Sequence, residues 1–460
     1  MKHRMLIVFI LCSLVAGVLP LSAEIGFDWG FRERIRNTYM NNNADFSSAD
    51  DKNDFFRFRT NLWGSMSYKA FTAKIQFTNE FRKYMIIPDG KKGDFTLDEI
   101  IIDNLYLNWT SQGSVPVSVT LGRQNLIYGE GFILLEGAPW DGSRAIYHDA
   151  IKMSFKLDNT TIDLLGIDNT QLEERLPAIP LGDLENSEGL PKNADGEQWM
   201  NDSHEQAFGI YAVQKREASQ YEGYYFMKKE GPEAWIGSPP VNEDLTLHTL
   251  GGRALLPVAE DLKLTTEWAY QFGKRGDLSQ SAYGGYAYLT YNLNSEKKMN
   301  VMGGFNLLSG DDPSTDDNEG WNPIFSRWPK WSELYIYSQV MESVRGTHKV
   351  AYWTNTFSPY VKYNVNVTPN VSMQACYYHL RALQDASFWN PNALSEGKTR
   401  GDEFQLLFKF KFTKCLSGHF LFDYFLPGDF YQQIDAGGSR IESNLENAVF
   451  IRGELMYTLP

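Results

Sequence analysis

Cysteine is scarce in this chain, with only Cys12, Cys376 and Cys415 among 460 residues. Cys12 falls inside a leading apolar segment that we expect to be removed from the mature protein. Two remaining cysteines are too few to form the framework of a disulfide-rich secreted domain. We therefore favour two free thiols over a single bridge between Cys376 and Cys415.

Long apolar runs are also lacking beyond the first residues, so the chain offers no helix that could span a membrane. At the start, a basic Lys-His-Arg precedes the apolar stretch from Met5 to Val18, and Leu21-Ser22-Ala23 follows. This order is typical of a cleavable signal peptide. We predict that residues 1–23 are removed and that residues 24–460 leave the cytoplasm as one domain.

Motifs for catalysis and nucleotide binding are missing as well. The glycine pairs of the second half lie in or beside predicted strands, and neither a P-loop nor a dinucleotide fingerprint follows them. The seven histidines are scattered, and the local pair His419 and Asp423 has no serine motif beside it, which favours a simple hydrogen bond. The sequence therefore predicts neither an enzyme nor a nucleic-acid-binding protein, and no cofactor.

Aromatic residues, in contrast, are abundant. They make up 14% of the chain, with 25 Tyr, 29 Phe and 12 Trp, while the mean hydropathy is −0.38. An exported chain that is polar on average and rich in aromatics is typical of an outer-membrane barrel, because only one face of each strand is apolar. A large secreted β-sandwich or solenoid is the alternative on composition alone.

Strict alternation of apolar and polar residues favours the barrel. Phe56, Phe58 and Leu62 alternate with Arg57 and Arg59, so that each strand has one apolar and one charged face. Similar segments predict eighteen strands. They lie near residues 24–37, 54–67, 70–83, 100–110, 115–124, 148–157, 160–168, 206–216, 220–229, 243–255, 261–273, 279–293, 298–309, 354–367, 370–383, 401–413, 416–426 and 447–459.

The connections between these segments alternate between short and long. Such wiring is typical of bacterial outer-membrane proteins, which have short periplasmic turns and long extracellular loops, and a Greek-key sandwich does not require it. We therefore predict an all-β protein, a single transmembrane up-and-down antiparallel β-barrel of about 18 strands. Its location would be the outer membrane of a Gram-negative-type envelope, in contact with outer-membrane lipids.

The charge is distributed unevenly along the chain. The formal net charge is −14, but the acids collect in predicted loops, whereas the polar faces of the strands are mainly basic. A charge that faces lipid is costly, so these faces should line the lumen, where basic side chains favour anions. The alternative is that these basic residues pair with acids and stiffen the wall. The candidates are Arg32, Arg34, Arg57, Arg59, Lys74, Arg82, Lys152, Lys362, Lys409 and Arg452.

Several ordered motifs add a resemblance to a known family. They are Gly122-Arg123-Gln124 with Tyr128-Gly129, Trp140, Arg144 and Asp149-Ala150; Ser309-Gly310-Asp311 with Asn322-Pro323-Ile324-Phe325; and the closing Asp423–Phe430 with Arg452-Gly453-Glu454-Leu455. In this order they resemble the alginate-export porin family. The resemblance implies an eighteen-stranded barrel that passes an anionic polysaccharide through an arginine-rich constriction, with long loops folded over or into the pore.

The resemblance also implies that Arg123 and Arg144 lie at the constriction. Strict alternation would put Arg123 on the lipid side with Leu121, so a bulge or a strand end at Gly122 would have to turn it inward. Expected partners are an anionic saccharide or another anionic solute, with periplasmic secretion components as a further expectation.

Three alternatives stay open. One is an anion-preferring uptake porin for small solutes, and another is a plugged barrel whose extracellular loops act as an adhesin or receptor. The third concerns calcium, because oxygen-rich acidic loops suit this ion. Its candidate ligands, which lack the twelve-residue calcium-loop pattern, are Asp311, Asp312, Asp316 and Asp317.

Overall fold

The computed structural model describes residues 25–43, 46, 52–86, 95–96, 99–111, 113–135, 147–177, 179–180, 203–232, 243–326, 353–386, 393–435 and 445–459. The predicted signal peptide at 1–23 and the predicted constriction residue Arg144 lie outside these residues. No helix in the described ranges is long and apolar enough to cross a membrane.

In the described part of the chain, eighteen antiparallel strands form one sheet. They are β1 (Gly26–Asn41), β2 (Asn53–Tyr68), β3 (Phe71–Ile86), β5 (Glu99–Ser111), β6 (Val117–Gln124), β7 (His148–Leu157), β8 (Thr160–Asn169), β10 (Glu205–Lys215), β11 (Gln220–Glu230), β12 (Leu245–Ala259), β13 (Leu262–Arg275), β14 (Leu278–Asn294), β15 (Met299–Leu308), β16 (Thr356–Thr368), β17 (Val371–Arg381), β19 (Thr399–Lys411), β20 (Leu416–Pro427) and β22 (Ala448–Leu459). Short accessory pieces are β4 (Phe95–Thr96), β9 (Ile179–Pro180), β18 (Ala393–Ser395), β21 (Gln433–Asp435) and the 3-10 helix η2 (Asp429–Tyr431).

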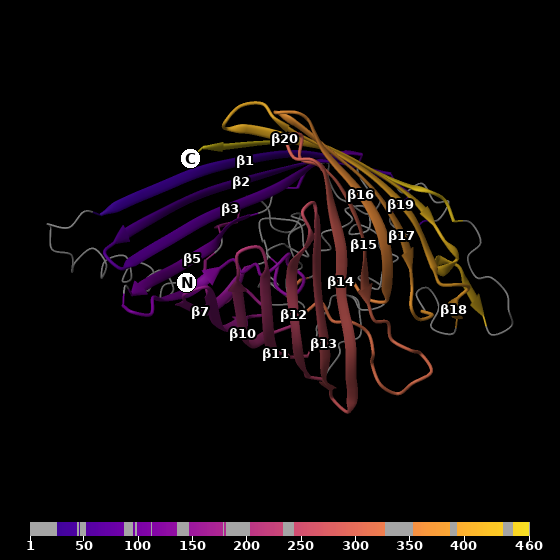
Figure 1. Cartoon of the computed structure of the whole chain (residues 1–460), viewed down its shortest axis with the longest axis horizontal. Coiled ribbons are helices and arrows are strands. Elements are labelled where there is room, and N and C mark those ends of the chain that lie inside the picture. The colour runs from indigo at the N-terminus through magenta and orange to yellow at the C-terminus, as the bar shows by residue number, and fades with distance from the viewer. Residues whose placement is uncertain are drawn as a thin grey trace.

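The sheet closes on itself. Each of the eighteen strands pairs with the next along the chain, and β22 returns to β1 over pairs from Phe31 with Leu459 to Asn41 with Val449. Figure 1 shows the strands side by side around a continuous wall, with the last strands of the chain beside the indigo β1. Closure gives each of the eighteen strands a partner on both sides, which is the condition for a β-structure to cross a membrane.

The predicted strands are confirmed, since each of the eighteen ranges coincides with one strand and no end differs by more than four residues. The predicted alternation of short and long connections has one exception, the two-residue connection 276–277 between β13 and β14. Several of the tight turns contain a residue with positive φ, such as Lys69 at 52° and Asp158 at 48°. Two-residue hairpins need this conformation to match the twist of their strands.

The two faces of the wall differ as the alternation predicts. Outward positions keep large apolar side chains exposed, for example Phe27 at 75%, Leu121 at 60% and Leu250 at 58%. The opposite positions face the lumen and carry the buried polar and aromatic residues. Cys376 and Cys415 are both free, as expected.

Candidate functional site

Arginines gather on the inner faces of three consecutive strands, β1, β2 and β3. Pairing sets Arg34 opposite Arg59 and Arg36 opposite Arg57, and Arg57 lies opposite Arg82 on β3. Residues directly opposite one another on antiparallel strands project to the same side of the sheet and are close neighbours. Alternation along each strand and this register therefore bring five guanidinium groups together on one patch of wall.

Glu80 on β3 lies at the centre of this patch and has no exposed side-chain surface. Its carboxylate is 2.7 Å from Nη2 of Arg34, 3.4 Å from Nε of Arg57 and 2.5 Å from Nε of Arg59. The side chains of Arg34 and Arg59 remain 17% and 20% exposed, whereas that of Arg57 is 2% exposed. One buried carboxylate thus orients three guanidinium groups, two of which remain partly open to the lumen.

A second acid, Glu454 on β22, continues this network on the neighbouring strand. Its Oε2 is 2.7 Å from Nη2 of Arg36, and its Oε1 is 3.3 Å from Nδ1 of His419. Nε of Arg452 donates to Nε2 of the same histidine at 2.8 Å. His419, on the adjacent strand β20, therefore links Glu454 to Arg452.

The other basic residues predicted on the polar faces of strands also have inward-facing register positions. The exposed Arg32 stands 5.8 Å from the centroid of the Trp63 ring, and Nη1 of Arg82 donates to the Tyr84 hydroxyl at 3.2 Å. The lysines are spread around the barrel: Lys74 pairs with Ser65 and Tyr106, Lys152 with Thr120 and Leu165, Lys362 with Met302 and Cys376, and Lys409 with Ser372 and His419.

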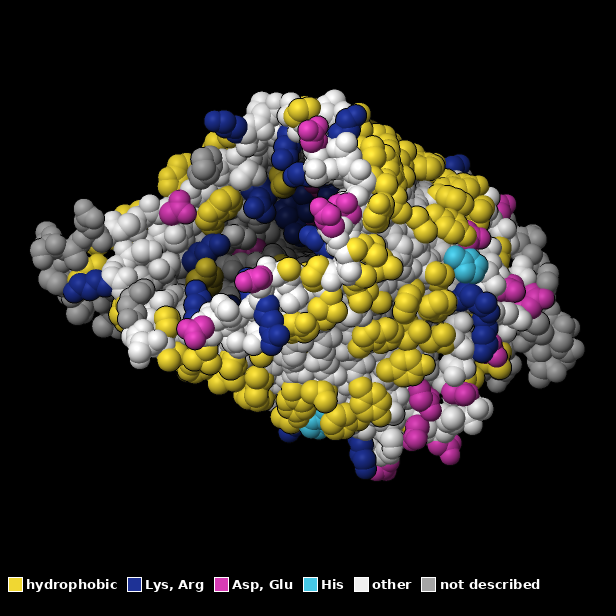
Figure 2. Space-filling view, viewed as in Figure 1, with side chains coloured by type: hydrophobic (Ala, Val, Ile, Leu, Met, Phe, Trp, Pro, Cys, Tyr) yellow, Lys and Arg dark blue, Asp and Glu magenta, His cyan; other side chains and the backbone are white. Residues whose placement is uncertain are grey.

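We call the inner faces of β22, β1, β2 and β3 the basic wall. Its basic residues outnumber its acidic residues by eight to three. The basic residues are Arg32, Arg34, Arg36, Arg57, Arg59, Lys74, Arg82 and Arg452, and the acidic residues are Asp28, Glu80 and Glu454. Figure 2 shows Lys and Arg side chains gathered around the hollow of the molecule, while hydrophobic side chains cover the outside of the wall.

Two chain segments fill another part of the lumen. Residues 125–135, the first inner segment, and residues 309–326, the second inner segment, meet at the parallel bridge between Leu134 and Phe325. Phe132 stacks on Trp321 with ring centroids 5.1 Å apart, and both rings are buried. A Cβ added at Gly284, on the inner face of β14, would lie 2.8 Å from the Trp321 ring. The glycine therefore makes room for this stack against the wall.

Polar contacts fix the two inner segments to β8, β11 and β13. Oη of Tyr128 donates to Oδ2 of Asp163 at 2.5 Å, and Nζ of Lys228 donates to the carbonyl of Ile324 at 2.8 Å. Gln271 exchanges two hydrogen bonds with the backbone of Asn322, at 2.6 and 2.9 Å. These contacts hold both inner segments inside the barrel, as the family resemblance implies for long loops.

Sequence reasoning missed two basic residues of this region, Arg253 and Lys228. Nη1 of Arg253 lies 2.5 Å from Glu222, and Nζ of Lys228 lies 2.8 Å from Glu205 and 2.7 Å from Glu230. Both had a sequence signal, because they occupy inward positions in predicted strands. Glu222 and Glu205 belong to neighbouring strands and Glu230 to the same strand as Lys228, so acids close at hand bring this side of the lumen near to charge balance.

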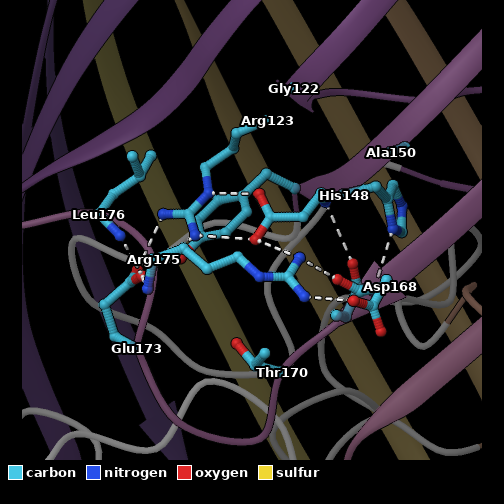
Figure 3. Close-up of polar contacts among 12 residues, drawn as sticks. Gly122, Arg123, His148, Ala150, Asp168, Thr170, Glu173, Arg175 and Leu176 are labelled. Carbon is cyan, nitrogen blue, oxygen red and sulfur yellow. Dashed lines mark hydrogen bonds and ion pairs between the residues drawn. The ribbon is translucent and has the colours of Figure 1, made fainter. Parts of the chain in front are cut away.

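Arg123 differs from the expectation that it lies at the constriction. Register sets it opposite Leu105 and Asp149, at outward positions of the wall, and its side chain is 1% exposed. Its guanidinium forms ion pairs with Asp149 and Glu173, and Figure 3 shows Glu173, Arg175 and Asp168 gathered near it. Gly122 has a φ of 123°, but β6 keeps its register with β5 and β7 there, so no bulge turns Arg123 to the inner face.

Gly122 is expected to be essential for this local geometry. A Cβ at this position would lie 2.3 Å from the carbonyl oxygen of Leu105, and the positive φ disfavours any other residue. We predict that Gly122→Ala destabilises the barrel by roughly 1–3 kcal/mol from backbone strain, before the clash is counted. Urea unfolding followed by heat-modifiable gel migration would measure it. Gly223→Ala, whose Cβ would meet nothing within 4 Å, is the control.

All four calcium candidates lie in the second inner segment, and the side chains of Asp311 and Asp312 accept hydrogen bonds within it. Oδ1 of Asp311 accepts from the backbone of Glu319 at 3.1 Å, and Oδ1 of Asp312 accepts from the Ser314 backbone at 2.9 Å and its hydroxyl at 2.7 Å. In the described ranges, no three His, Cys, Asp or Glu side chains come close enough to hold a metal ion. Hydrogen bonds within the chain thus account for Asp311 and Asp312.

Comparison with protein families gives a match over nearly the whole chain. The family model described as alginate export matches residues 22–442. A search of curated proteins gives no match.

Solved structures agree on the architecture. OccK5 (OpdH) of Pseudomonas aeruginosa is 14% identical, with a TM-score of 0.52 over 94% of this chain and 98% of that one. OccAB4 of Acinetobacter baumannii is 11% identical, with a TM-score of 0.55 over 96% and 100%. The outer membrane protein opdK of Pseudomonas aeruginosa is 11% identical, with a TM-score of 0.53 over 94% and 100%. At these identities the likeness shows the fold.

Proposed function

Because the chain belongs to the alginate export family and is an outer-membrane porin, we propose that its pore passes anionic solutes along the basic wall. The observation that carries this proposal is the excess of eight basic over three acidic residues on β22, β1, β2 and β3. Basic side chains that line a pore between low-dielectric walls concentrate anions and repel cations.

The arrangement of the arginines supports a solute with several negative charges. Arg32, Arg34 and Arg36 follow one another on the same face of β1, so their Cα atoms are spaced about 6.5 Å apart along the strand. Arg57 and Arg59 form a second such row on β2. A flexible chain with repeated carboxylates can contact several of these residues at once, which adds up weak single contacts. An acidic polysaccharide such as alginate is therefore the finer form of the proposal.

A second candidate is passage of small anionic solutes in the uptake direction. The inner segments favour a small solute over a polymer, because buried rings such as Phe132 and Trp321 occupy part of the lumen. Both candidates share the same selectivity for negative charge. They differ in whether a polymer can enter.

Ion selectivity in planar bilayers tests the shared proposal. We expect purified, folded protein to form channels whose reversal potential in a KCl gradient shows anion preference. The preference should shrink as salt rises, because the Debye length falls from roughly 30 Å at 0.01 M to about 3 Å at 1 M. Cation preference, or no conductance from folded protein, would overturn the pore mechanism. Block of the current by polyuronate chains, with no block by neutral dextran of similar length, would favour the polysaccharide over small solutes.

A further inference from the structure

We propose that Arg123 is a positioning residue: it seals the barrel wall where β6 ends and thereby holds the first inner segment in the lumen without contacting the solute. This inference rests on the proposed pore function and assigns Arg123 a part other than the one that the family resemblance implies. Two observations support this proposal: the contacts of the Arg123 guanidinium and the unequal lengths of the strands around it.

The wall is incomplete beside β6. This strand stops at Gln124 and pairs with β5 only from Leu105 to Ser111, although β5 begins at Glu99. Farther along, β9 pairs with Glu99 and Ile100 of β5. Between these two partners, a stretch of β5 backbone has neither strand beside it. Polar backbone groups left in this way inside a membrane barrel cost free energy unless another donor satisfies them.

Arg123 supplies such a donor and uses its full hydrogen-bonding capacity locally. Nη1 donates to the carbonyl of Ile102 at 3.2 Å, within the uncovered stretch of β5, and to Glu173 at 2.8 Å. Nε and Nη2 donate to the two oxygens of Asp149 at 2.9 and 3.1 Å, and Nη2 also donates to Glu173 at 3.1 Å. The five N–H groups of the guanidinium are thus matched by five acceptors, which leaves none for a solute.

The acceptors belong to three different parts of the wall. Ile102 lies on β5, Asp149 on β7, and Glu173 in the segment that follows β8. Tyr147 covers the group, with its ring centroid 4.1 Å from Cζ of Arg123, and its hydroxyl donates to Glu173 at 3.2 Å. The buried side chain of Arg123 therefore joins three parts of the wall that strand pairing does not connect beyond the end of β6.

The contacts continue outward from Asp149 over the next strands. Arg175 lies 3.3 Å from Oδ2 of Asp149 and also contacts Asp168 on β8. Asp168 in turn accepts from Gln206 on β10 at 3.0 Å and is 2.6 Å from Nε2 of His204. Asp168 and Gln206 occupy outward positions in the register, together with the exposed Phe208. This network therefore lies on the outside of the barrel, away from the basic wall.

The first inner segment begins one residue after β6, directly beside this junction. Nε2 of Gln124 donates to the carbonyls of Gly122 and Ala150 at 3.1 and 3.0 Å, which fixes the last residue before the chain turns inward. From there Leu126 and Phe132 are buried in the interior. If the junction loosens, the base of the segment is free to move, and the space beside the basic wall changes with it.

Three variants in planar bilayers test the proposal: Arg123→Gln, Arg123→Lys and Glu173→Gln. Lysine keeps the positive charge but cannot reproduce the planar fork of hydrogen bonds. We expect all three to raise single-channel conductance and current noise, with no shift in reversal potential relative to the unsubstituted protein. Arg59→Gln is the comparator, because Arg59 lies on the basic wall and its loss should shift the reversal potential towards cations. Heat-modifiable gel migration identifies folded protein.

The outcomes separate this proposal from the pore proposal. If Arg123 contacts the solute, Arg123→Lys will resemble the unsubstituted protein, Arg123→Gln will lose anion preference, and Glu173→Gln will gain it; this result would overturn the positioning role. Unchanged conductance and noise in folded Arg123→Gln and Glu173→Gln would also overturn it. Cation preference of the unsubstituted protein overturns the pore proposal instead, while the conductance comparison among the variants still reports on the junction.

Discussion

Replacing Arg34 and Arg59 together with glutamine is expected to remove most of the anion preference of the pore. These two side chains are the partly exposed members of the cluster around Glu80, at 17% and 20%, and they reach the lumen from neighbouring strands. A unit charge about 4 Å from a permeating ion contributes about 1 kcal/mol in a water-like dielectric. Loss of one such contact therefore lowers the local preference for an anion on the order of fivefold, and loss of both lowers it further.

The reversal potential in a dilute KCl gradient measures this change, since high salt would screen it. Lys229→Gln with Arg381→Gln is the matched control, because both are exposed, occupy outward positions on β11 and β17, and remove the same charge. We expect the control pair to keep the reversal potential of the unsubstituted protein. If the control shifts it as far as the Arg34 and Arg59 pair does, net charge rather than the basic wall sets the selectivity.

Because Glu80 lies between Arg34 and Arg59, glutamine is a better replacement than glutamate at these two positions. Its carboxylate has no exposed surface, and it depends on Arg34, Arg57 and Arg59 for compensation of its charge. Removal of two partners leaves Arg57 in place, whereas two added carboxylates would set three acids against one another in a buried site. We therefore expect the double glutamine variant to fold, and gel migration before and after heating checks this directly.

The barrel itself could be predicted from the sequence because its signal is local. Residues such as Phe56, Arg57, Phe58 and Arg59 report their own environment, since lipid and lumen alternate along each strand. The same rule placed the basic residues of β1, β2 and β3 on the inner face. It could not show that Glu80 would gather three of them, because the contacts join residues from 21 to 46 positions apart.

For Arg123, two predictions from the sequence conflicted over the direction of its side chain. Alternation set it on the lipid side, and the family resemblance set it at the constriction, so the two arguments disagreed. The structure follows the alternation, and the charge is compensated by Glu173, fifty residues away in the chain. The glycine before it signalled an irregular strand but not the direction of the side chain. The alternation had given that direction, whereas the partner Glu173 could not be predicted, because its contact with Arg123 is a tertiary one that no sequence spacing encodes.

The inner segments depend even more on distant contacts. Trp321 packs against Gly284 of β14 and against Phe132, residues that lie far from it in the chain. Composition showed many aromatic residues but did not place any of them inside the lumen. A buried aromatic stack that packs against the inner face of the wall needs a position there without a side chain, which an inward-facing glycine provides. Gly284 was visible as part of a glycine pair, although its partner ring was not.

Replacement of Trp321 with alanine is accordingly expected to widen the pore. The ring is 1% exposed, and its removal takes away the stack that joins the two inner segments. Loss of a buried tryptophan typically costs about 3–5 kcal/mol, enough to free the segments from the wall while the strand pairing of the barrel stays intact. We expect a clear rise in single-channel conductance with anion preference retained, because the basic wall is untouched.

Trp268→Ala is the matched control for this experiment. Trp268 lies on β13 at an outward position with 41% exposure, so its loss removes an indole from the lipid side and leaves the lumen unchanged. Equal conductance for Trp321→Ala and Trp268→Ala, with both proteins folded, would mean that the inner segments do not limit ion flow. A rise confined to Trp321→Ala assigns the pore width to the inner segments, while selectivity stays with the basic wall. The two properties would then depend on separate residues and could be changed independently.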